Sequence, residues 1–405
     1  MSLTHRPAPP ALLTAEGRPA IADWSLTPHR IHLNHGSFGA VPRAAQAVLQ
    51  NLRDQMEANP CAWFMPLPQR VKAARTQVAA FLGVAAEETA FVPNASAGVS
   101  TVLNTVVREP GSRVLTTSHA YGAVREACAR AAKRVNGHLD IAELPLGAAA
   151  ETVVSALENS LTEQTALIVI DQVTSASARL FPVGQIVRLA AQRNIPVLID
   201  GAHATAVIER PVPEGDVFWV GNLHKFGCAP RGTAVLVARG AQAPQLTPLI
   251  DSWGFPYPYP DNFDHVGTQD NVSWLAAPVA LDFIEQNYGW NTFRRHAQEL
   301  CDYGEDVITG AFEAATGENV RVDVGLPVGP MRLLALPSGL AETHEDSHLV
   351  RAFIADEFSF ETAITSLDGR GYLRLSAHLY NTAGDYETFA EKVVPALVRF
   401  ARNRA

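Results

Sequence analysis

Short sets of mostly polar residues follow five apolar runs of this 405-residue sequence. They are Asn94, Ala95 and Ser96 after TAFVP; His119 and Tyr121 after RVLTTS; Asp171 and Ser175 after TALIVI; Asp200 and His203 after IPVLI; and Asn222, His224 and Lys225 after VFWV. Open α/β sheets bind ligands outside the carboxyl ends of their strands, which meet at one edge of the sheet. If the runs are parallel strands, these residues converge on one site.

Each of these residues also has a purely structural interpretation. Asn94 and Ser96 suit the start of a helix, where a side-chain oxygen caps the first backbone amides. Asp171 and Asp200 suit turns, and a lysine such as Lys225 is most often solvated on the surface. For most of these residues taken singly the structural interpretation is the stronger one, so it is the convergence of five sets that favours a binding site.

A lysine, a carboxylate, a helix start and a flat ring together form the set that pyridoxal phosphate (PLP) chemistry uses. A lysine between an apolar strand and a tight turn, such as Lys225, can lose its proton and form a Schiff base. A carboxylate at a neighbouring strand end, such as Asp200, can keep a pyridine nitrogen protonated, so that the ring acts as an electron sink. The amides of Ala95 and Ser96 offer a phosphate seat, and His119 can stack on the ring.

The apolar runs themselves predict the fold. They are short, rich in β-branched residues and free of alternation, which is typical of strands buried on both faces, and helix-like segments lie between them. We therefore expect an α/β protein with a mostly parallel, doubly wound sheet, preceded by helices over 43–58 and 68–82. The predicted divisions are an N-terminal arm over 1–30, a large domain over 31–290 and a small α+β domain over 291–405.

Composition excludes several classes of protein. The net charge of −9 and the pI near 5.8 argue against a general affinity for nucleic acid or for an anionic membrane surface. No window approaches the roughly 20 apolar residues of a membrane helix, and residues 1–13 do not have the order of a signal peptide, so we expect a cytoplasmic protein. The four cysteines are far apart and form no CxxC pair, which argues against a metal site or a disulfide framework.

Eight stretches of the sequence carry a family resemblance. They are LNHGSFGAVPRAA, FVPNASAGVSTVLNTV, TSHAYGAVREA, IDQVTSASARLFPV, LIDGAHA, GNLHKFGCAPRG, GTQDNVSWLAAPVALDF and LRLSAHLYN. In this order, from about residue 31 to 383, the chain resembles the class V aminotransferase group of fold-type I PLP enzymes, and more narrowly its isopenicillin N epimerase-like branch. The pair LIDGAHA and GNLHKFGCAPRG is the most specific part of this resemblance.

The resemblance implies a role for each cofactor residue. Lys225 matches the Schiff-base lysine, Asp200 the partner of the pyridine nitrogen, and His203 the partner of the ring hydroxyl. His119 matches the residue stacked on the ring, although Tyr121 could take that place. The phosphate contacts implied are Ala95, Ser96, Asn222 and His224, with Thr268 reaching the phosphate of the other subunit, and the strand-end residues Asn94, Asp171 and Ser175 complete the expected cofactor set.

The resemblance also implies how a substrate is bound. Arg374 matches the arginine that grips the substrate carboxylate, and Asn34 and His35 lie on the segment that lines the substrate entrance. The family is homodimeric with shared active sites. Two departures leave the substrate class open: the region of Cys61–Trp63 lacks a basic residue that is frequent in the family, and Gln269 stands where an arginine is common.

Several reactions fit these residues. The sequence predicts chemistry at the Cα atom of an amino-acid group carried by a larger molecule, such as a thioether-linked cysteine conjugate in natural-product biosynthesis. Epimerisation needs Lys225 and an acid on the opposite face, for which His119 or Tyr121 could serve; β-elimination of a thiolate needs one base. Oxidative decarboxylation or deamination and transamination stay open. Persulfide transfer is disfavoured because 343–371 contains no cysteine, and a serine hydrolase because no GxSxG occurs.

Overall fold

The computed structural model describes residues 6–404, which form two compact units. The larger unit holds residues 41–175 and 180–283, and the smaller unit holds the chain up to Ala40, the short segment 176–179 and the chain from Ile284 onward. The chain therefore leaves and re-enters the smaller unit. The predicted division into an arm over 1–30, a large domain over 31–290 and a small domain over 291–405 stays a prediction.

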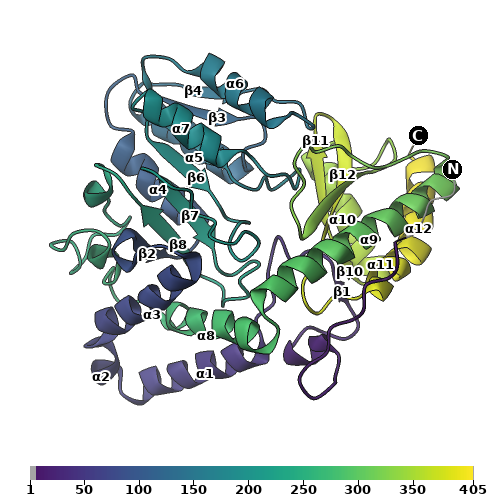
Figure 1. The fold of residues 1–405 in the computed structure, drawn as a ribbon, viewed down its shortest axis with the longest axis horizontal. Coiled ribbons are helices and arrows are strands. Elements are labelled where there is room, and N and C mark those ends of the chain that lie inside the picture. Colours follow the sequence, from purple (N-terminus) through teal and green to yellow (C-terminus); the bar gives the residue numbers. More distant parts are fainter. Residues whose placement is uncertain (1–5, 405) are drawn as a thin grey trace. The chain divides into compact units, whose positions relative to one another are not determined.

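The larger unit is built on a seven-stranded sheet with the order β2-β8-β7-β6-β5-β3-β4 (Figure 1). The strands are β2 Thr89–Val92, β3 Arg113–Thr117, β4 Leu139–Ala142, β5 Thr165–Asp171, β6 Val197–Asp200, β7 Phe218–Asn222 and β8 Ala234–Ala238. Strands β4, β3, β5, β6 and β7 are parallel to one another, and β8 runs antiparallel between β7 and β2. The predicted α/β fold with a mostly parallel sheet is confirmed.

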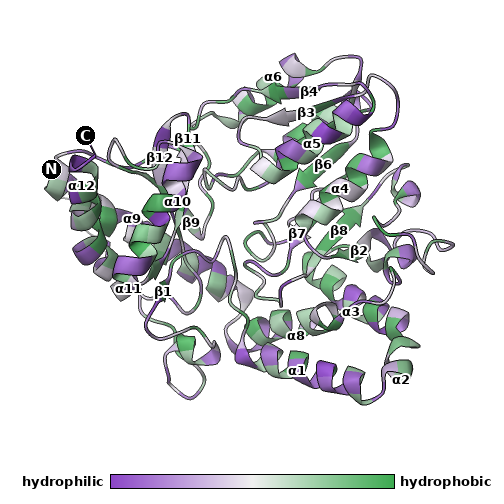
Figure 2. Cartoon of the chain, turned by 180° about the vertical axis from the view of Figure 1, so that it is seen from behind, coloured by the Kyte–Doolittle hydropathy of each residue, from purple (hydrophilic) through white to green (hydrophobic). Residues whose placement is uncertain are grey.

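Helices cover the sheet because its strands are apolar on both faces. Leu167, Val169 and Leu198 belong to one core cluster with α4 Ala95–Val106 and α5 Gly122–Arg134, and the alternate residues Ile168 and Ile199 are also fully buried. Helices α6 Ala150–Ser160 and α7 Val183–Gln192 complete the crossovers. Such strands read as continuous apolar runs, and β6, β7 and β8 carry the hydrophobic colour in Figure 2.

Further helices of the larger unit precede and follow the sheet. They are α1 Arg43–Ala58, α2 Pro60–Phe64, α3 Leu67–Leu82 and α8 Val272–Asn287, whose last turn belongs to the smaller unit, together with the short 3-10 turns η2 Ala86–Glu88, η3 Ala243–Gln245 and η4 Asp261–Phe263. The predicted helices over 43–58 and 68–82 match α1 and α3. Arg75 of α3 is buried and bonds Asp261 and Asp264, which ties the loop after β8 to this helix.

The smaller unit combines an antiparallel sheet with long helices. Its strands are β9 Met331–Ala335, β11 Ala363–Leu367 and β12 Arg370–Ser376 in the order β11-β12-β9, and the parallel pair β1 Ile31–His32 and β10 Phe360–Glu361. Its helical segments are η1 Ala20–Asp23, α9 Trp290–Thr316, α10 His344–Phe358, α11 Ala383–Thr388, the π-helical turn η5 Phe389–Val393 and α12 Val394–Arg402. Strand β1 places the segment that follows the predicted arm inside this unit.

No helix in the described part of the chain, residues 6–404, is long and apolar enough to cross a membrane. This agrees with the hydropathy of the sequence, whose apolar segments are short and interrupted by turns.

Candidate active site

The carboxyl ends of three neighbouring strands bring the predicted cofactor residues together in the larger unit. Asp171, the last residue of β5, pairs in register with Asp200, the last residue of β6, and Asp200 pairs with Val220 of β7. Strand β7 ends two residues later at Asn222, and the chain turns directly into His224 and Lys225. The expectation that these residues meet at one edge of the sheet is correct for β5, β6 and β7.

Lys225 lies against His203 at this edge. Its Nζ atom is 2.9 Å from His203 Nε2, and the lysine is half-buried while the histidine is buried. The two residues come from the turns that follow β7 and β6, so the contact joins the motifs that the sequence singled out. An amine in a partly desolvated place beside an imidazole is suited to losing its proton.

Two buried carboxyl groups, those of Asp200 and Asp171, interact with the charge of this lysine. Burial raises the pKa of Asp200, although the N–H of Ala202, which donates to Asp200 Oδ1 over 2.9 Å, and the charge of Lys225 act in the opposite direction. Burial, and then the charge of Asp200, raise the pKa of Asp171 well above its ordinary value, against a hydrogen bond from the backbone of Tyr121. A site with two such groups favours a bound cation, which would keep one of them ionised.

The start of α4 lies next to the end of β7. Asn222 Oδ1 accepts a hydrogen bond from the N–H of Ala95 over 2.9 Å, and Asn94 caps the helix by accepting from Ala97 over the same distance. Both Asn94 and Ser96 are exposed, and within residues 6–404 neither the N–H nor the hydroxyl of Ser96 has a hydrogen-bond partner. The helix start therefore keeps donors at Ser96 for an anion, while the amide of Ala95 is already used by Asn222.

His224 is fixed in its neutral form. Its Nδ1–H donates to the carbonyl of Thr233 over 2.9 Å, and burial lowers the pKa of the imidazole to about 4. A neutral imidazole at neutral pH contributes a dipole and a hydrogen-bond site to the edge of the sheet, and it adds no charge.

His119 and Tyr121 differ in their surroundings. His119 is buried, its Nε2 lies 3.1 Å from the carbonyl oxygen of Leu144, and its ring meets Phe181 edge to face at 5.7 Å between centroids. Tyr121, by contrast, is 47% exposed. His119 is therefore a buried ring held by its neighbours, whereas Tyr121 is a phenol open to solvent.

Two predicted cofactor residues lie at the margins of this group. Ser175 is half-buried at the end of its chain segment in the larger unit. Thr268 is exposed on the loop before α8, and no hydrogen bond within the described chain links it to the strand-end residues. Its predicted contact is with another subunit, so the single chain does not test it.

The predicted substrate residues meet in the smaller unit. Arg374 of β12 is 2% exposed, and its Nη2 donates to Asn34 Oδ1 over 3.2 Å and to Ser37 Oγ over 2.8 Å. His35 Nδ1 lies 2.5 Å from the hydroxyl of Tyr380, and the His35 ring stacks on that of His378 with centroids 4.0 Å apart. Two neutral oxygens, those of Asn34 and Ser37, thus orient the guanidinium, while His35, next to Asn34 in the chain, is held by Tyr380 and His378.

Sequence reasoning missed several residues that hold these groups in place. Ser37 and Tyr380 support Arg374 and His35, and both lie inside stretches that carry the family resemblance, which was the available signal. Gln172 and Trp219 support the strand ends of the larger unit. Each stands beside a predicted residue in the sequence or close to one, but neither side chain has a chemical type that suggests catalysis.

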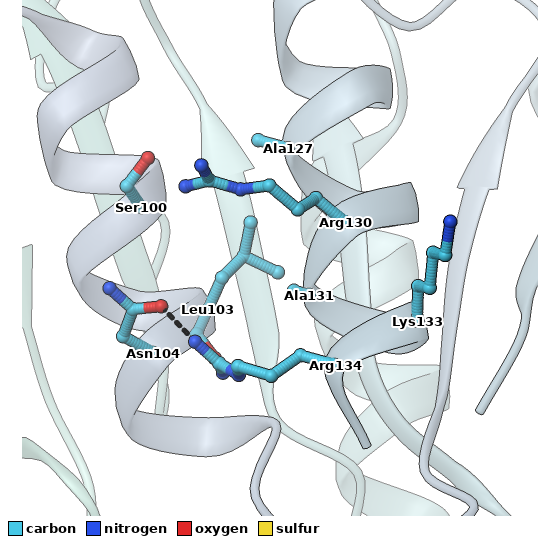
Figure 3. A pocket seen from close by; sticks show the side chains of 8 residues that line it. All are labelled: Ser100, Leu103, Asn104, Ala127, Arg130, Ala131, Lys133 and Arg134. Carbon is cyan, nitrogen blue, oxygen red and sulfur yellow. Dashed lines mark hydrogen bonds between the residues drawn. The ribbon is translucent and has the colours of Figure 1, made fainter. Parts of the chain in front are cut away.

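A cavity of about 410 Å³ lies apart from this set, between α4 and α5 (Figure 3). Arg130 and Arg134 extend from α5 toward α4, and Arg134 donates to Asn104 Oδ1 and to the carbonyls of Leu103 and Val107 at the carboxyl end of α4. A cation in this position stabilises a helix terminus. None of the residues that line the cavity belongs to the predicted site.

The strand-end residues fit PLP. They supply a lysine, a buried carboxylate on the adjacent strand, and a helix start with donors at Ser96, all within one compact unit. Burial raises the pKa of both carboxyl groups, and a cation such as a protonated pyridine nitrogen would favour the ionised form of one of them. Fold and site together define a PLP-dependent enzyme of fold-type I.

Comparison with known proteins gives the family. Residues 64–314 match the family described as aminotransferase class-V, so the chain belongs to that family and its cofactor is PLP, as the sequence predicted. The chain is 25% identical to the isopenicillin N epimerase of Streptomyces clavuligerus over 92% of this chain and 98% of that protein. It is 26% identical to an L-cysteine desulfhydrase of Arabidopsis thaliana, over 89% of this chain and 86% of that protein.

Solved structures share the fold. A cysteine desulfurase of Thermococcus onnurineus matches with a TM-score of 0.78 at 18% identity, over 96% of this chain and 99% of that chain. A mutant of the protein C-DES, with glycine covalently linked to its PLP cofactor, matches with a TM-score of 0.78 at 15% identity, over 93% of this chain and 99% of that chain. The epimerase-like branch and the fold that the sequence predicted are both confirmed.

Proposed function

We propose that this protein abstracts the Cα proton of an amino-acid group carried by a larger substrate, and that it completes either a β-elimination or an epimerisation. The observation that carries the proposal is the cluster of Lys225, His203 and Asp200 at adjoining strand ends, with Lys225 Nζ 2.9 Å from His203 Nε2. Bound PLP supplies the electron sink that stabilises negative charge at Cα.

The residues of the chain have separate tasks in this proposal. Lys225 would hold the cofactor and would move the proton at Cα, and Asp200 would hold the proton of the pyridine nitrogen. His203 orients Lys225 and the ring hydroxyl. Ser96, Asn222 and the start of α4 hold the phosphate, because exposed donors at a helix start bind anions.

The choice between reactions depends on a second acid. Epimerisation requires a proton donor on the face opposite Lys225, and His119 or Tyr121 would have to supply it. β-Elimination requires only Lys225 and a good leaving group. Relatives of both kinds exist: besides the epimerases and desulfhydrases, the chain is 24% identical to a hercynylcysteine sulfoxide lyase of Schizosaccharomyces pombe over 71% of this chain and 76% of that protein.

We favour a carbon–sulfur lyase acting on a cysteine thioether conjugate, within a cytoplasmic natural-product pathway. The desulfhydrase and lyase relatives support this choice, and the lack of cysteine in 343–371 argues against sulfur transfer to the enzyme. A screen of cysteine conjugates in deuterated water tests it. Pyruvate release indicates a lyase, deuterium at an inverted Cα indicates an epimerase, and carbon dioxide release indicates the oxidative decarboxylation that we regard as the alternative.

We also propose that Arg374 binds the substrate carboxylate. Its guanidinium is buried and oriented by Asn34 and Ser37, and a planar fork of donors held in this way matches a carboxylate with two parallel hydrogen bonds. This assignment predicts that a methyl ester of the substrate is a poor substrate for the native enzyme.

The protein is further proposed to be a homodimer. In the larger unit the loop after β8 exposes a run of apolar side chains, with Ile250 63%, Trp253 79%, Phe255 58% and Tyr257 59% exposed. Clusters of this kind mark association surfaces. Sedimentation of Trp253→Asp should show a monomer, with Leu349→Asp on α10, a side chain that is 57% exposed, as the matched control that stays dimeric.

A further inference from the structure

The indole of Trp219 lies beneath the two backbone segments that carry Asp200 and Lys225. Trp219 is the second residue of β7 and is fully buried. Its ring occupies the space next to Gly201, which directly follows Asp200, and next to Gly221, which directly precedes Asn222. One side chain therefore touches the ends of both β6 and β7.

The two glycines leave no room for any other residue. A Cβ atom on Gly201 would lie 2.4 Å from Trp219 Cε2 and Nε1, and a Cβ atom on Gly221 would lie 2.1 Å from Trp219 Cη2. Carbon atoms in contact normally stand about 3.5–4.0 Å apart, so a side chain at either position would push the strand end away from the ring. The glycines in LIDGAHA and GNLHK are thus explained by close contact with Trp219.

Gln172 fixes the indole in this place. Its Oε1 accepts a hydrogen bond from Trp219 Nε1 over 2.8 Å, its Nε2 donates to the carbonyl of Pro211 over 2.6 Å, and its backbone N–H donates to the carbonyl of Asp200 over 2.8 Å. Gln172 directly follows Asp171 and is buried. Gln172 therefore connects the ends of β5 and β6 through its backbone, and its side chain holds the ring that supports β7.

We propose that Trp219, held by Gln172, is a positioning residue that sets the place of Asp200 relative to Lys225 and so tunes both cofactor binding and Cα chemistry. The inference rests on the proposed PLP chemistry at Lys225. It requires that a change to Trp219 alters the cofactor itself and not only the stability of the fold.

The test is Trp219→Phe in the full-length PLP-loaded enzyme, with Trp274→Phe as the matched control. Trp274 is also buried in the larger unit, and its Nε1 also donates a hydrogen bond, to the carbonyl of Gly232 over 2.9 Å. The readouts are the dissociation constant of PLP, the pH midpoint of the absorption band of the bound cofactor, and kcat against KM. A displacement of about 1 Å at a reacting centre costs on the order of 100-fold in rate.

For Trp219→Phe we expect weaker PLP binding, a shifted absorption midpoint and a large fall in kcat with little change in KM, and for Trp274→Phe none of these. The double variant Gln172→Leu/Trp219→Phe, measured beside Gln172→Leu, completes a double-mutant cycle. Both of these variants lose the hydrogen bond from Gln172 to the carbonyl of Pro211, so the loss of that bond cancels in the cycle. Coupling between the two positions should appear in the dissociation constant of PLP as well as in Tm.

Failure of the inference on Trp219 can be distinguished from failure of the proposed function. If Trp219→Phe lowers Tm but leaves the PLP dissociation constant, the absorption midpoint and kcat at native values, Trp219 only supports the fold and the inference is overturned. If instead the native protein carries PLP on a lysine other than Lys225, the proposed function itself fails, whatever Trp219 does.

Discussion

The strand-end cluster of the larger unit and the arginine cluster of the smaller unit show opposite electrostatic designs. The first collects two buried carboxyl groups, Asp171 and Asp200, whose pKa values burial raises. The second buries one guanidinium, that of Arg374, and orients it with the neutral oxygens of Asn34 and Ser37. The carboxyl groups are suited to a cation and the guanidinium to an anion, which are the two ends that a PLP enzyme acting on amino acids must recognise.

The clusters also differ in how the chain assembles them. In the larger unit, Asp200 and Lys225 are 25 positions apart and follow neighbouring strands, β6 and β7. In the smaller unit, Arg374 is held by residues about 340 positions earlier in the chain. Parallel strands with short crossovers place the first set almost automatically, whereas the second depends on the N-terminal segment adding strand β1 to the C-terminal part of the chain.

Replacement of Lys225 should have the largest effect. Lys225→Ala removes the only amine in the strand-end cluster of the described chain, so covalent cofactor binding should be lost, with a fall in turnover of at least about 10²–10⁴-fold from the missing proton transfer. Borohydride reduction of the native enzyme followed by peptide mapping should label Lys225. A label on Lys72, Lys133 or Lys392 would show that the strand-end cluster does not hold the cofactor.

Asp200→Asn should come next. The amide fills the same space but cannot keep the pyridine nitrogen protonated, so PLP should stay bound while turnover falls at least about 10²-fold, the scale seen when one charge-stabilising group is removed. Cofactor content by absorbance and turnover with the best substrate of the screen are the measurements. Near-native turnover would mean that Asp200 is not the partner of the ring.

Arg374→Lys tests the arginine cluster of the smaller unit, which we propose binds the substrate carboxylate. A lysine keeps the charge but not the planar fork, and a lost charge-assisted hydrogen bond of about 1.5–3 kcal/mol corresponds to a fall in kcat/KM of roughly 10–100-fold. The absorption spectrum of the resting enzyme should not change. Arg370→Lys, an exposed arginine on the same strand, is the control that should keep native kinetics. If the acid and its methyl ester react equally well with the native enzyme, the carboxylate is bound elsewhere.

Asp171→Asn should have the smallest effect of these variants, and we expect that effect on the thermal stability of the apoenzyme. Because the pKa of Asp171 is raised in the folded state, the folded protein holds a proton that the unfolded chain has released once the pH exceeds about 3.9. Stability from this group is therefore lost as the pH rises through the folded-state pKa. We expect the Tm of the apoenzyme to be about 2–4 °C higher in Asp171→Asn at pH 8. The difference should vanish near pH 4, which thermal melts at the two pH values can check.

The sequence predicted six of the seven strands of the larger sheet, all but the edge strand β4, and it missed strands β10 and β11 of the smaller unit. The runs that became β2, β3, β5, β6, β7 and β8 are apolar and β-branched because helices cover both faces of the sheet. Strand β4 is an edge strand with half-exposed residues and a charged Asp140, so its pattern resembles a loop. Strands β10 and β11 were missed for a similar reason: β10 has only two residues, and β11 is apolar only over its first half.

The sequence by itself indicated the kind of chemistry: a lysine, a carboxylate and a helix start stand at the ends of apolar runs, and parallel strands bring such ends to one edge of a sheet. The tertiary structure alone decided how these groups are held. Trp219 lies against Gly201 and Gly221, Gln172 binds its indole, and Ser37 orients Arg374; all of these contacts except that with Gly221 join separate elements of the chain. Such contacts depend on distances between folded segments, and no pattern within a single segment of sequence encodes them.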